Sequence, residues 1–173
     1  MRAVAILAIG MLAGTPGFSH RLDEYLQGTI LSIEKTRILG QMILTPGVAV
    51  YPFVNSSIDS DGDGTISQAE QRAYAAQVLR DVSLTSDGQP LKIQLLATHF
   101  ATLADMKEGR GEIQLDFAAD LPRGARSRKL TFENHHQIRI AAYSVNTLVP
   151  SDPDLRITSQ NRNYSQSLYD VEY

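Results

Sequence analysis

The sequence predicts an α+β fold, mostly an antiparallel β-sandwich with one inserted helix-loop-helix. Three observations support this class. Short segments of alternating apolar and polar residues recur along the chain, separated by turn residues, as in antiparallel sandwiches. One stretch near the middle has the composition and periodicity of a helix. The composition, 43% hydrophobic and 20% charged, is that of a globular domain.

The first nineteen residues have the features of a secretory signal peptide. Arg2 gives a positive start, Ala3 to Leu12 is apolar, and small, turn-forming residues follow. This run is too short to cross a bilayer as a helix, and no later run reaches about 18 apolar residues. We therefore expect residues 1–19 to be removed, and residues 20–173 to form a single β-rich domain without a membrane span. A buried N-terminal helix is the alternative.

The start of this domain predicts a β-hairpin. Tyr25 to Ile33 and Arg37 to Leu44 alternate apolar and polar residues, and Glu34-Lys-Thr36 between them can close the turn. Thr45-Pro-Gly47 is a turn signal that ends the second strand.

Residues 52–82 interrupt the strand pattern and predict the inserted helix-loop-helix. Pro52 suits the first turn of a short helix ending at Ile58, because its missing N–H has no helical partner there. The Ala- and Gln-rich stretch from Ser67 to Val82 carries an apolar stripe at helical spacing. Ser67 followed by Glu70 has the spacing of a capping box at the start of this helix.

Strand signals resume after the helix. Val82–Thr85 and Leu91–Phe100 flank Asp87-Gly88, a favoured hairpin turn. Gly111 to Ala118 alternates cleanly. Four further segments complete the predicted strands: Lys129–Glu133, Ile138–Val149, Leu155–Ser159 and Ser167–Tyr173.

The segment between the two predicted helices holds the strongest chemical signal. From Asp59 to Glu70 it matches the pattern D-x-[DN]-x-[DN]-G-x5-E at every specified position. Alternate positions of a tightly wound loop bring three carboxylates together, and Ca²⁺ takes six to eight oxygen ligands. Gly64 permits the sharp turn. An acidic Asp-Gly turn that merely precedes a helix cap is the alternative. Mg²⁺ is a weaker alternative ion because it keeps its waters.

The segment from Pro52 to Val82 resembles an EF-hand calcium-binding motif. The resemblance implies Ca²⁺ as cofactor, with carboxylate ligands, a backbone carbonyl, a hydroxyl acting directly or through water, and a closing bidentate glutamate. The predicted metal-binding residues are Asp59, Asp61, Asp63, Thr65, Ser67 and Glu70. EF-hands usually occur in pairs, and Asp152-Pro-Asp154 lacks the glycine and closing glutamate of a second loop. A lone site is expected to be structural and weak.

A wider resemblance rests on three segments, His20–Gln27, Leu44–Val50 and Tyr143–Pro153. They are similar to the uncharacterised bacterial extracytoplasmic domain that often precedes membrane spans of the HupE/UreJ type, a group linked to nickel or cobalt uptake. The resemblance covers most of residues 20–173 and implies a periplasmic location. The chain departs from that pattern in ending at Tyr173 without spans, so we expect at most a soluble partner or a stand-alone relative.

The alternative function is transition-metal (Ni, Co or Cu) binding, or delivery of such a metal to a membrane transporter. After cleavage His20 would offer an α-amine and an imidazole together, which suits Cu(II) or Ni(II). Asp23, His135 or His136 could complete the site. The competing interpretation is an exposed terminal histidine, with His135 and His136 in a polar turn.

Composition excludes several other function classes. Without cysteine the chain has no disulfide, thiolate metal site or thiol nucleophile. A net charge of −3 argues against nucleic-acid binding. No motif for a serine nucleophile, a zinc hydrolase or a phosphate loop is present, so an enzyme is not expected. The sequence thus predicts a periplasmic or secreted, non-enzymatic, calcium-binding domain. Its expected partners are the calcium ion and a membrane transporter or other envelope protein.

Overall fold

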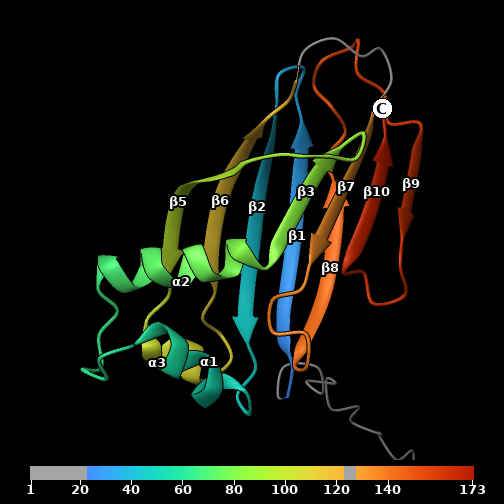
Figure 1. Ribbon diagram of the computed structural model, residues 1–173. Helices are drawn as coiled ribbons and strands as arrows, with labels where there is room; N and C mark the ends of the chain where they lie inside the picture. Colours follow the sequence, from blue (N-terminus) through green and yellow to red (C-terminus); the bar gives the residue numbers. More distant parts are fainter. Residues whose placement is uncertain (1–22, 123–127) are drawn as a thin grey trace, which may run out of the picture.

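The structure is a computed structural model that describes residues 23–122 and 128–173. The predicted signal peptide and His20 therefore lie outside the described residues. The described part is mostly β, with two five-stranded sheets and three helices (Figure 1). The prediction of a mostly β chain carrying a small helical component is confirmed at this level.

The two sheets draw on interleaved parts of the chain. Sheet A has the order β5 (Ile93–Phe100), β6 (Ile113–Asp120), β2 (Arg37–Pro46), β1 (Tyr25–Ile33) and β8 (Ala141–Thr147). Sheet B has the order β4 (Gln89–Pro90), β3 (Val82–Ser86), β7 (Lys129–Asn134), β10 (Leu168–Glu172) and β9 (Ser159–Arg162). Neither sheet is built from a continuous stretch of sequence.

Alternation sorts the two faces of sheet A as the sequence predicts. In β1, β2 and β6, buried side chains alternate with side chains on the opposite face, here called the outer face. The buried hydrophobic side chains on the inner face of these strands are Tyr25, Leu31, Ile33, Ile38, Met42, Leu44, Ile113, Leu115, Phe117 and Ala119. Gly40 belongs to this inner row, and the Phe117 ring lies across it so closely that an added Cβ would sit 2.0 Å from the ring. The glycine is therefore required by a close approach across the strand pair.

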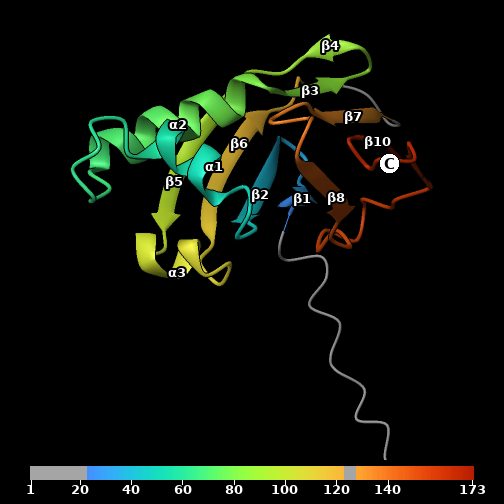
Figure 2. The ribbon, with the colours of Figure 1, turned by 90° about the horizontal axis from the view of Figure 1, so that it is seen from below.

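Three helices accompany the sheets. α1 (Tyr51–Ile58) and α2 (Gln68–Arg80) follow β2, and α2 runs across β5, β6 and β2 (Figure 1). The capping box is confirmed, since Ser67 accepts the Glu70 N–H while the Glu70 side chain accepts the Ser67 N–H. Seen from below, α2 and sheet B lie over the same, inner face of sheet A (Figure 2). The core fills the space between them.

Some predicted elements differ from those observed. The hairpin expected between Val82–Thr85 and Leu91–Phe100 shrinks to two residue pairs of β3 and β4, because β5 pairs with β6 in sheet A. The strand expected at Leu155–Ser159 is wrong, since β9 begins only at Ser159. Helix α3 (Leu103–Lys107) was not predicted, because five residues are too few to display a helical period.

One pairing could not be read from alternation at all. β1 pairs in parallel with β8, from Tyr25 with Ala141 to Leu31 with Thr147. Alternation reports which face a side chain occupies, and it carries no information on strand direction. Of the helices in the described part of the chain, none has both the length and the apolar character needed to cross a bilayer.

Candidate metal centre

The loop between α1 and α2 begins where α1 ends. The Asp59 N–H donates to the carbonyl of Asn55, and the chain then leaves the helical conformation. Gly62 and Gly64 have φ values of +73° and +80°, a conformation that side chains disfavour. These two glycines let the chain wind tightly enough to bring alternate residues of the loop to one point.

Three carboxylates meet in this loop. Oxygen atoms of Asp59, Asp61 and Asp63 all lie within 4.8 Å of one another. Backbone donors orient them: Gly64 N–H donates to Asp59 Oδ2 at 3.1 Å, and Asp63 N–H donates to Asp61 Oδ1 at 3.2 Å. The loop thus presents oxygen ligands at a spacing that a single cation can bridge.

One oxygen in this cluster lacks a partner. Asp59 Oδ1 is buried and has no hydrogen bond within the described residues. A buried carboxylate oxygen without a donor or a cation is costly. Among the ion pairs formed between described residues, none includes Asp59, Asp61 or Asp63. The loop therefore holds concentrated negative charge that the described side chains do not neutralise.

Glu70 is placed differently from the three aspartates. Its Oε1 accepts from the N–H and hydroxyl of Ser60, and its Oε2 accepts from the N–H and hydroxyl of Ser67. The donors of Ser67, followed by those of Ser60, lower the pKa of Glu70 to about 2, so this buried side chain is ionised. In this arrangement Glu70 ties the beginning of the loop to the start of α2.

Thr65 and Ser67 also bind within the loop. The N–H and hydroxyl of Thr65 both donate to Asp63 Oδ1, at 2.8 and 2.7 Å. Ser67 serves as the N-cap of α2. Of the six predicted ligands, the three aspartates are brought together, Thr65 donates to Asp63, and Ser67 and Glu70 bond to each other.

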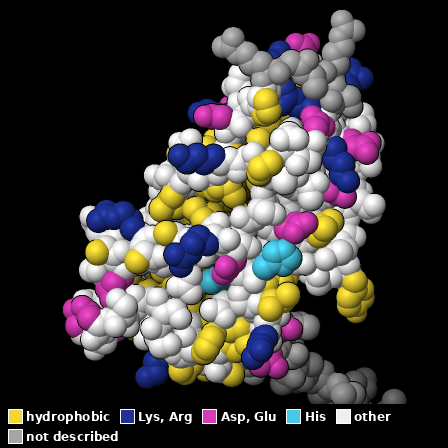
Figure 3. All heavy atoms as spheres, viewed as in Figure 1, with side chains coloured by type: hydrophobic (Ala, Val, Ile, Leu, Met, Phe, Trp, Pro, Cys, Tyr) yellow, Lys and Arg dark blue, Asp and Glu magenta, His cyan; other side chains and the backbone are white. Residues whose placement is uncertain are grey.

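The loop lies at an edge of the molecule. In the view of Figure 1, acidic side chains gather at the lower left of the space-filling surface, where the loop between α1 and α2 lies (Figure 3). Asp61 and Asp63 are exposed, so a dissolved ion can reach them directly.

A second group of polar residues was not predicted. His136 is fully buried, its Nδ1 lies 2.7 Å from Asp81 Oδ2, and its Nε2 lies 3.3 Å from the Tyr74 hydroxyl. That hydroxyl is in turn 2.7 Å from the hydroxyl of Tyr25. The turn expected at His135 and His136 is present, since residues 136–140 form a turn, but His136 is buried in it instead of facing solvent. The ring joins β1, α2 and the connection between β7 and β8.

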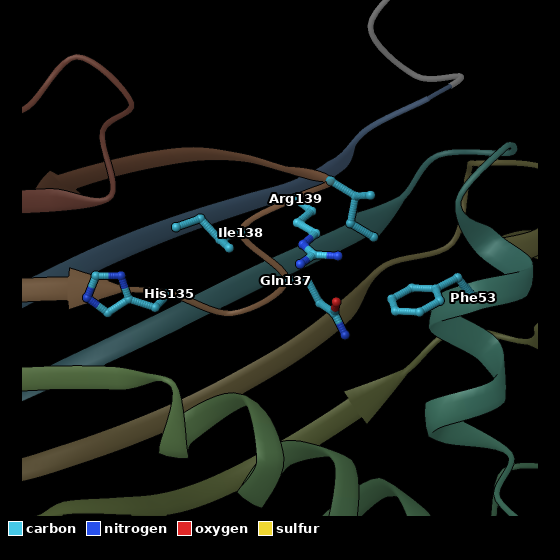
Figure 4. Close-up of a pocket in the computed structure, with 6 residues that line it drawn as sticks. Phe53, His135, Gln137, Ile138 and Arg139 are labelled. Atoms are coloured by element: carbon cyan, nitrogen blue, oxygen red, sulfur yellow. The ribbon is translucent and has the colours of Figure 1, made fainter.

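This chain of residues also bears on the transition-metal alternative. Both ring nitrogens of His136 already have partners, and His135 Nε2 lies 3.0 Å from Glu133. A hollow of about 420 Å³ separates α1 from residues 135–140 (Figure 4). Phe53 extends into it from α1, opposite Gln137 and Arg139, while His135 lies at its far end. The described residues that line the hollow offer one imidazole and no carboxylate, which is a poor set for a metal.

Comparison with known proteins adds no family to this description. No protein-family model matches the chain, and no curated protein matches it.

Proposed function

We propose that this chain is an exported calcium-binding protein in which one Ca²⁺ ion, held in the loop between α1 and α2, has a mainly structural role. The observation that carries the proposal is the convergence of Asp59, Asp61 and Asp63, together with the buried Asp59 oxygen that has no protein donor. A cation bound between these carboxylates would supply the missing partner and offset their repulsion.

The donor set favours calcium over other ions. Carboxylate, carbonyl and hydroxyl oxygens are hard ligands, which suit Ca²⁺ and Mg²⁺ better than Ni²⁺ or Cu²⁺. An exposed, glycine-containing loop adjusts to the irregular seven- or eight-oxygen shell of calcium more readily than to a strict octahedron. The EF-hand resemblance of Pro52 to Val82 agrees with this choice, and assigns the remaining ligand positions to Thr65, Ser67 and Glu70.

Glu70 sets the strength of the site. Its two oxygens accept four hydrogen bonds from Ser60 and Ser67. An ion that recruits Glu70 as the closing ligand must compete with these donors. This competition supports a weak site, in the range of about 10⁻⁴–10⁻³ M that extracellular calcium modules show.

The structural role follows from what α2 contacts. Tyr74, Ala75 and Val78 on α2 are buried against the core, and Val54 and Ile58 do the same on α1. The loop is the only covalent link between these two helices. An ion that orders the loop therefore stabilises the packing of both helices on sheet A, and it stabilises the folded state by mass action.

Export and the lack of catalysis complete the proposal. The N-terminal features from Arg2 to Leu12 support secretion to the periplasm or beyond, where millimolar calcium is available to a weak site. The Asp81–His136–Tyr74 chain contains the residue types of a proton relay, yet His136 and Tyr74 are buried away from any substrate. We assign it to structure, so the proposed protein is not an enzyme.

Isothermal titration calorimetry with CaCl₂ tests the proposal. We expect one site per chain, and a loss of at least tenfold in affinity for Asp61→Asn, which keeps the shape of the side chain and removes its charge. Asp154→Asn is the matched control, since Asp154 is an exposed aspartate of another Asp-x-Asp turn and should leave the titration unchanged. Absence of binding up to several millimolar calcium in the unmodified protein would refute the proposal.

A further inference from the structure

The outer face of sheet A carries exposed apolar side chains. Since α2 and sheet B cover the inner face (Figure 2), the outer face is where Ile30, Leu96 and Leu148 reach the surface, with exposed fractions of 40%, 59% and 54%. Two hollows of about 350 and 670 Å³ lie on this face and share Ile30. Ile30 on β1 therefore stands between two hollows of a partly apolar surface.

A single row of side chains crosses this face through Ile30. Asp116 on β6 pairs with Gln41 on β2, Gln41 pairs with Ile30 on β1, and Ile30 pairs with Asn146 on β8. Beyond β8, a terminal nitrogen of Arg162 donates to Asn146 Oδ1 at 3.0 Å. The row thus reads carboxylate, amide, aliphatic, amide, guanidinium. At about 4.8 Å between strands, Ile30 lies at its centre, about 10 Å from each charged end.

The next row of outer-face side chains, through Ser32, is also alike on the two sides of β1. Leu39 on β2 pairs with Ser32 on β1. On the other side of β1, Leu148 follows the last paired residue of β8, and its N–H donates to Leu31. An aliphatic side chain therefore flanks β1 on both sides, at matching height.

We propose that this face is the interface of a symmetric homodimer. We place the two-fold axis in the plane of the interface, parallel to β1 and next to Ile30. Rotation about this axis reverses the order of each row of side chains in the second copy. Asp116 of one copy then faces Arg162 of the other, Gln41 faces Asn146, and Ile30 meets its own counterpart. The same operation sets Leu39 against Leu148. One axis thus satisfies the charged, amide and apolar pairs together, as an isologous interface requires.

The two charged ends have capacity left for a partner. Arg162 donates to the carbonyl of Val145, to Asn146 and to Gln160, which uses three of the five N–H donors of a guanidinium. Asp116 accepts from Gln41 and Gln114, and a carboxylate has about four acceptor positions. These internal bonds hold both groups in place on the outer face, so little side-chain freedom is lost when they meet.

The size of the face suits a dimer of moderate affinity. The axis overlaps β6, β2, β1 and β8, with the Arg162 side chain beyond them; at about 4.8 Å between these five positions and about seven residues of length, the footprint is roughly 500 Å² per copy. The total is near the lower bound of about 1,000 Å² for specific interfaces. Two sheets packed face to face with aliphatic side chains between them is a common arrangement. We expect a dissociation constant in the micromolar range.

Charge exchange at the two ends gives a direct test. Sedimentation equilibrium on residues 20–173 should show a mass twice that of the single chain at micromolar concentration. Asp116→Arg or Arg162→Glu alone places like charges opposite each other, and should weaken the dimer at least tenfold. The double variant, with the charges exchanged, should recover most of this loss. A double variant that associates no better than the single variants would contradict the proposed axis.

A second pair of variants does not touch the charged groups. Ile30→Asp places two carboxylates against each other on the axis and should abolish the dimer. Val48→Asp is the control, because Val48 is 42% exposed, close to the 40% of Ile30, and lies in the turn after β2. Circular dichroism checks that both variants fold. If the unmodified protein is a monomer at about 100 μM, or if Ile30→Asp dimerises as well as Val48→Asp, the proposal is wrong. Recruitment of the monomer to lipid vesicles through this face would equally overturn it.

Discussion

The Nδ1 atom of His136 lies 2.7 Å from the Oδ2 atom of Asp81, and this contact ties the end of α2 to the connection between the two sheets. The main chain of His136 strengthens the tie, since its carbonyl accepts from the Gln27 side chain and from the Tyr143 hydroxyl. Both ends of α2 are therefore held, the first by the hydrogen bonds of Glu70 to the preceding loop and the second by the contact of His136 with Asp81.

The first prediction concerns the pH dependence of stability. Burial lowers the pKa of His136 below its ordinary value of 6.5, although the Asp81 carboxylate opposes the shift. The unfolded chain therefore binds a proton that the folded chain does not, and the free energy of unfolding falls as the pH drops below about 6.5. Urea denaturation between pH 7.5 and 5 should show this loss in the unmodified protein. His136→Gln should be less stable at pH 7.5 and show a flatter profile, whereas a flat profile in the unmodified protein would contradict the assignment. His135→Gln, at an exposed neighbour, should keep the normal profile.

The second prediction concerns the two buried tyrosines. Tyr74→Phe removes the hydroxyl that lies between Tyr25 and His136, and leaves the Tyr25 hydroxyl buried without this partner. We expect a loss of about 1–3 kcal/mol in the free energy of unfolding. Tyr25→Phe should lower the free energy of unfolding less in the Tyr74→Phe variant than in the unmodified protein, because the two hydroxyls interact with each other. Strict additivity in this double-mutant cycle would show that the hydroxyls do not interact. Tyr164→Phe, at a fully exposed tyrosine, serves as the control.

The third prediction separates the two roles of Glu70. Glu70→Gln places an amide NH₂ among the donors of Ser60 and Ser67, so it should lower thermal stability even in EDTA. Asp61→Asn should leave stability in EDTA unchanged and remove only the stabilisation by calcium. Equal behaviour of the two variants in EDTA would refute the tie between loop and helix that we describe.

The low pKa of Glu70 also predicts how the stability of the protein changes at acid pH. Donors from Ser67 and Ser60 hold its pKa at about 2, below the ordinary 4.5. The stability it contributes is complete above pH 4.5 and is lost as the pH falls towards 2. Urea denaturation in EDTA should show that the free energy of unfolding falls less between pH 5 and pH 3 for Glu70→Gln than for the unmodified protein. Glu34→Gln is the control: Glu34 forms an exposed ion pair with Arg37, and this variant should lose as much stability between pH 5 and pH 3 as the unmodified protein.

The fourth prediction concerns calcium and thermal unfolding. An ion at about 100 times its dissociation constant stabilises the folded state by about 2.7 kcal/mol. For a chain of this length that corresponds to a rise of about 5–10 °C in Tm. Differential scanning calorimetry with calcium and then with excess EDTA should show the rise and its reversal. A shift of the same size with equimolar magnesium would argue that the site does not prefer calcium.

The fifth prediction compares two glycines in neighbouring strands. A Cβ added at Gly40 would lie 2.0 Å from the Phe117 ring. A Cβ added at Gly28 would have the Ser144 hydroxyl oxygen as its nearest atom, at 3.5 Å. Gly40→Ala should therefore destabilise the protein by about 1–3 kcal/mol, and Gly28→Ala by much less. Phe117→Leu should relieve part of the Gly40→Ala penalty. Urea denaturation of the unmodified protein, the three single variants and the Gly40→Ala/Phe117→Leu double variant checks this, and equal effects of the two alanines would contradict it.

The sequence predicts the elements that its local patterns determine. Alternation identified Tyr25–Ile33 and Arg37–Leu44, and the capping-box spacing located the start of α2 at Ser67. The Asp-Gly pair at residues 87 and 88 also forms the turn between β3 and β4 that it predicts. In each case the residues that specify the structure are neighbours along the chain.

Long-range relationships could not be predicted in this way. The segment Leu91–Phe100 could pair with either β3 or β6, and no local feature of the sequence shows that it pairs with β6. The burial of His136 within its turn could not be predicted, because its partners, Asp81 and Tyr74, are more than 50 residues away. In the loop between α1 and α2, the pattern predicted which carboxylates converge but gave no sign that Ser60 would also donate to Glu70.

The parallel pairing of β1 with β8 has a consequence for how the chain acquires its fold. The partners, such as Tyr25 and Ala141, are separated by more than a hundred residues. As the chain emerges with its N-terminus first, the hairpin of β1 and β2 forms from local contacts and leaves one edge of β1 open until β8 arrives. Such an edge can recruit a strand from another chain. The interval before β8 arrives is therefore the period in which this protein is most exposed to aggregation and to proteolysis.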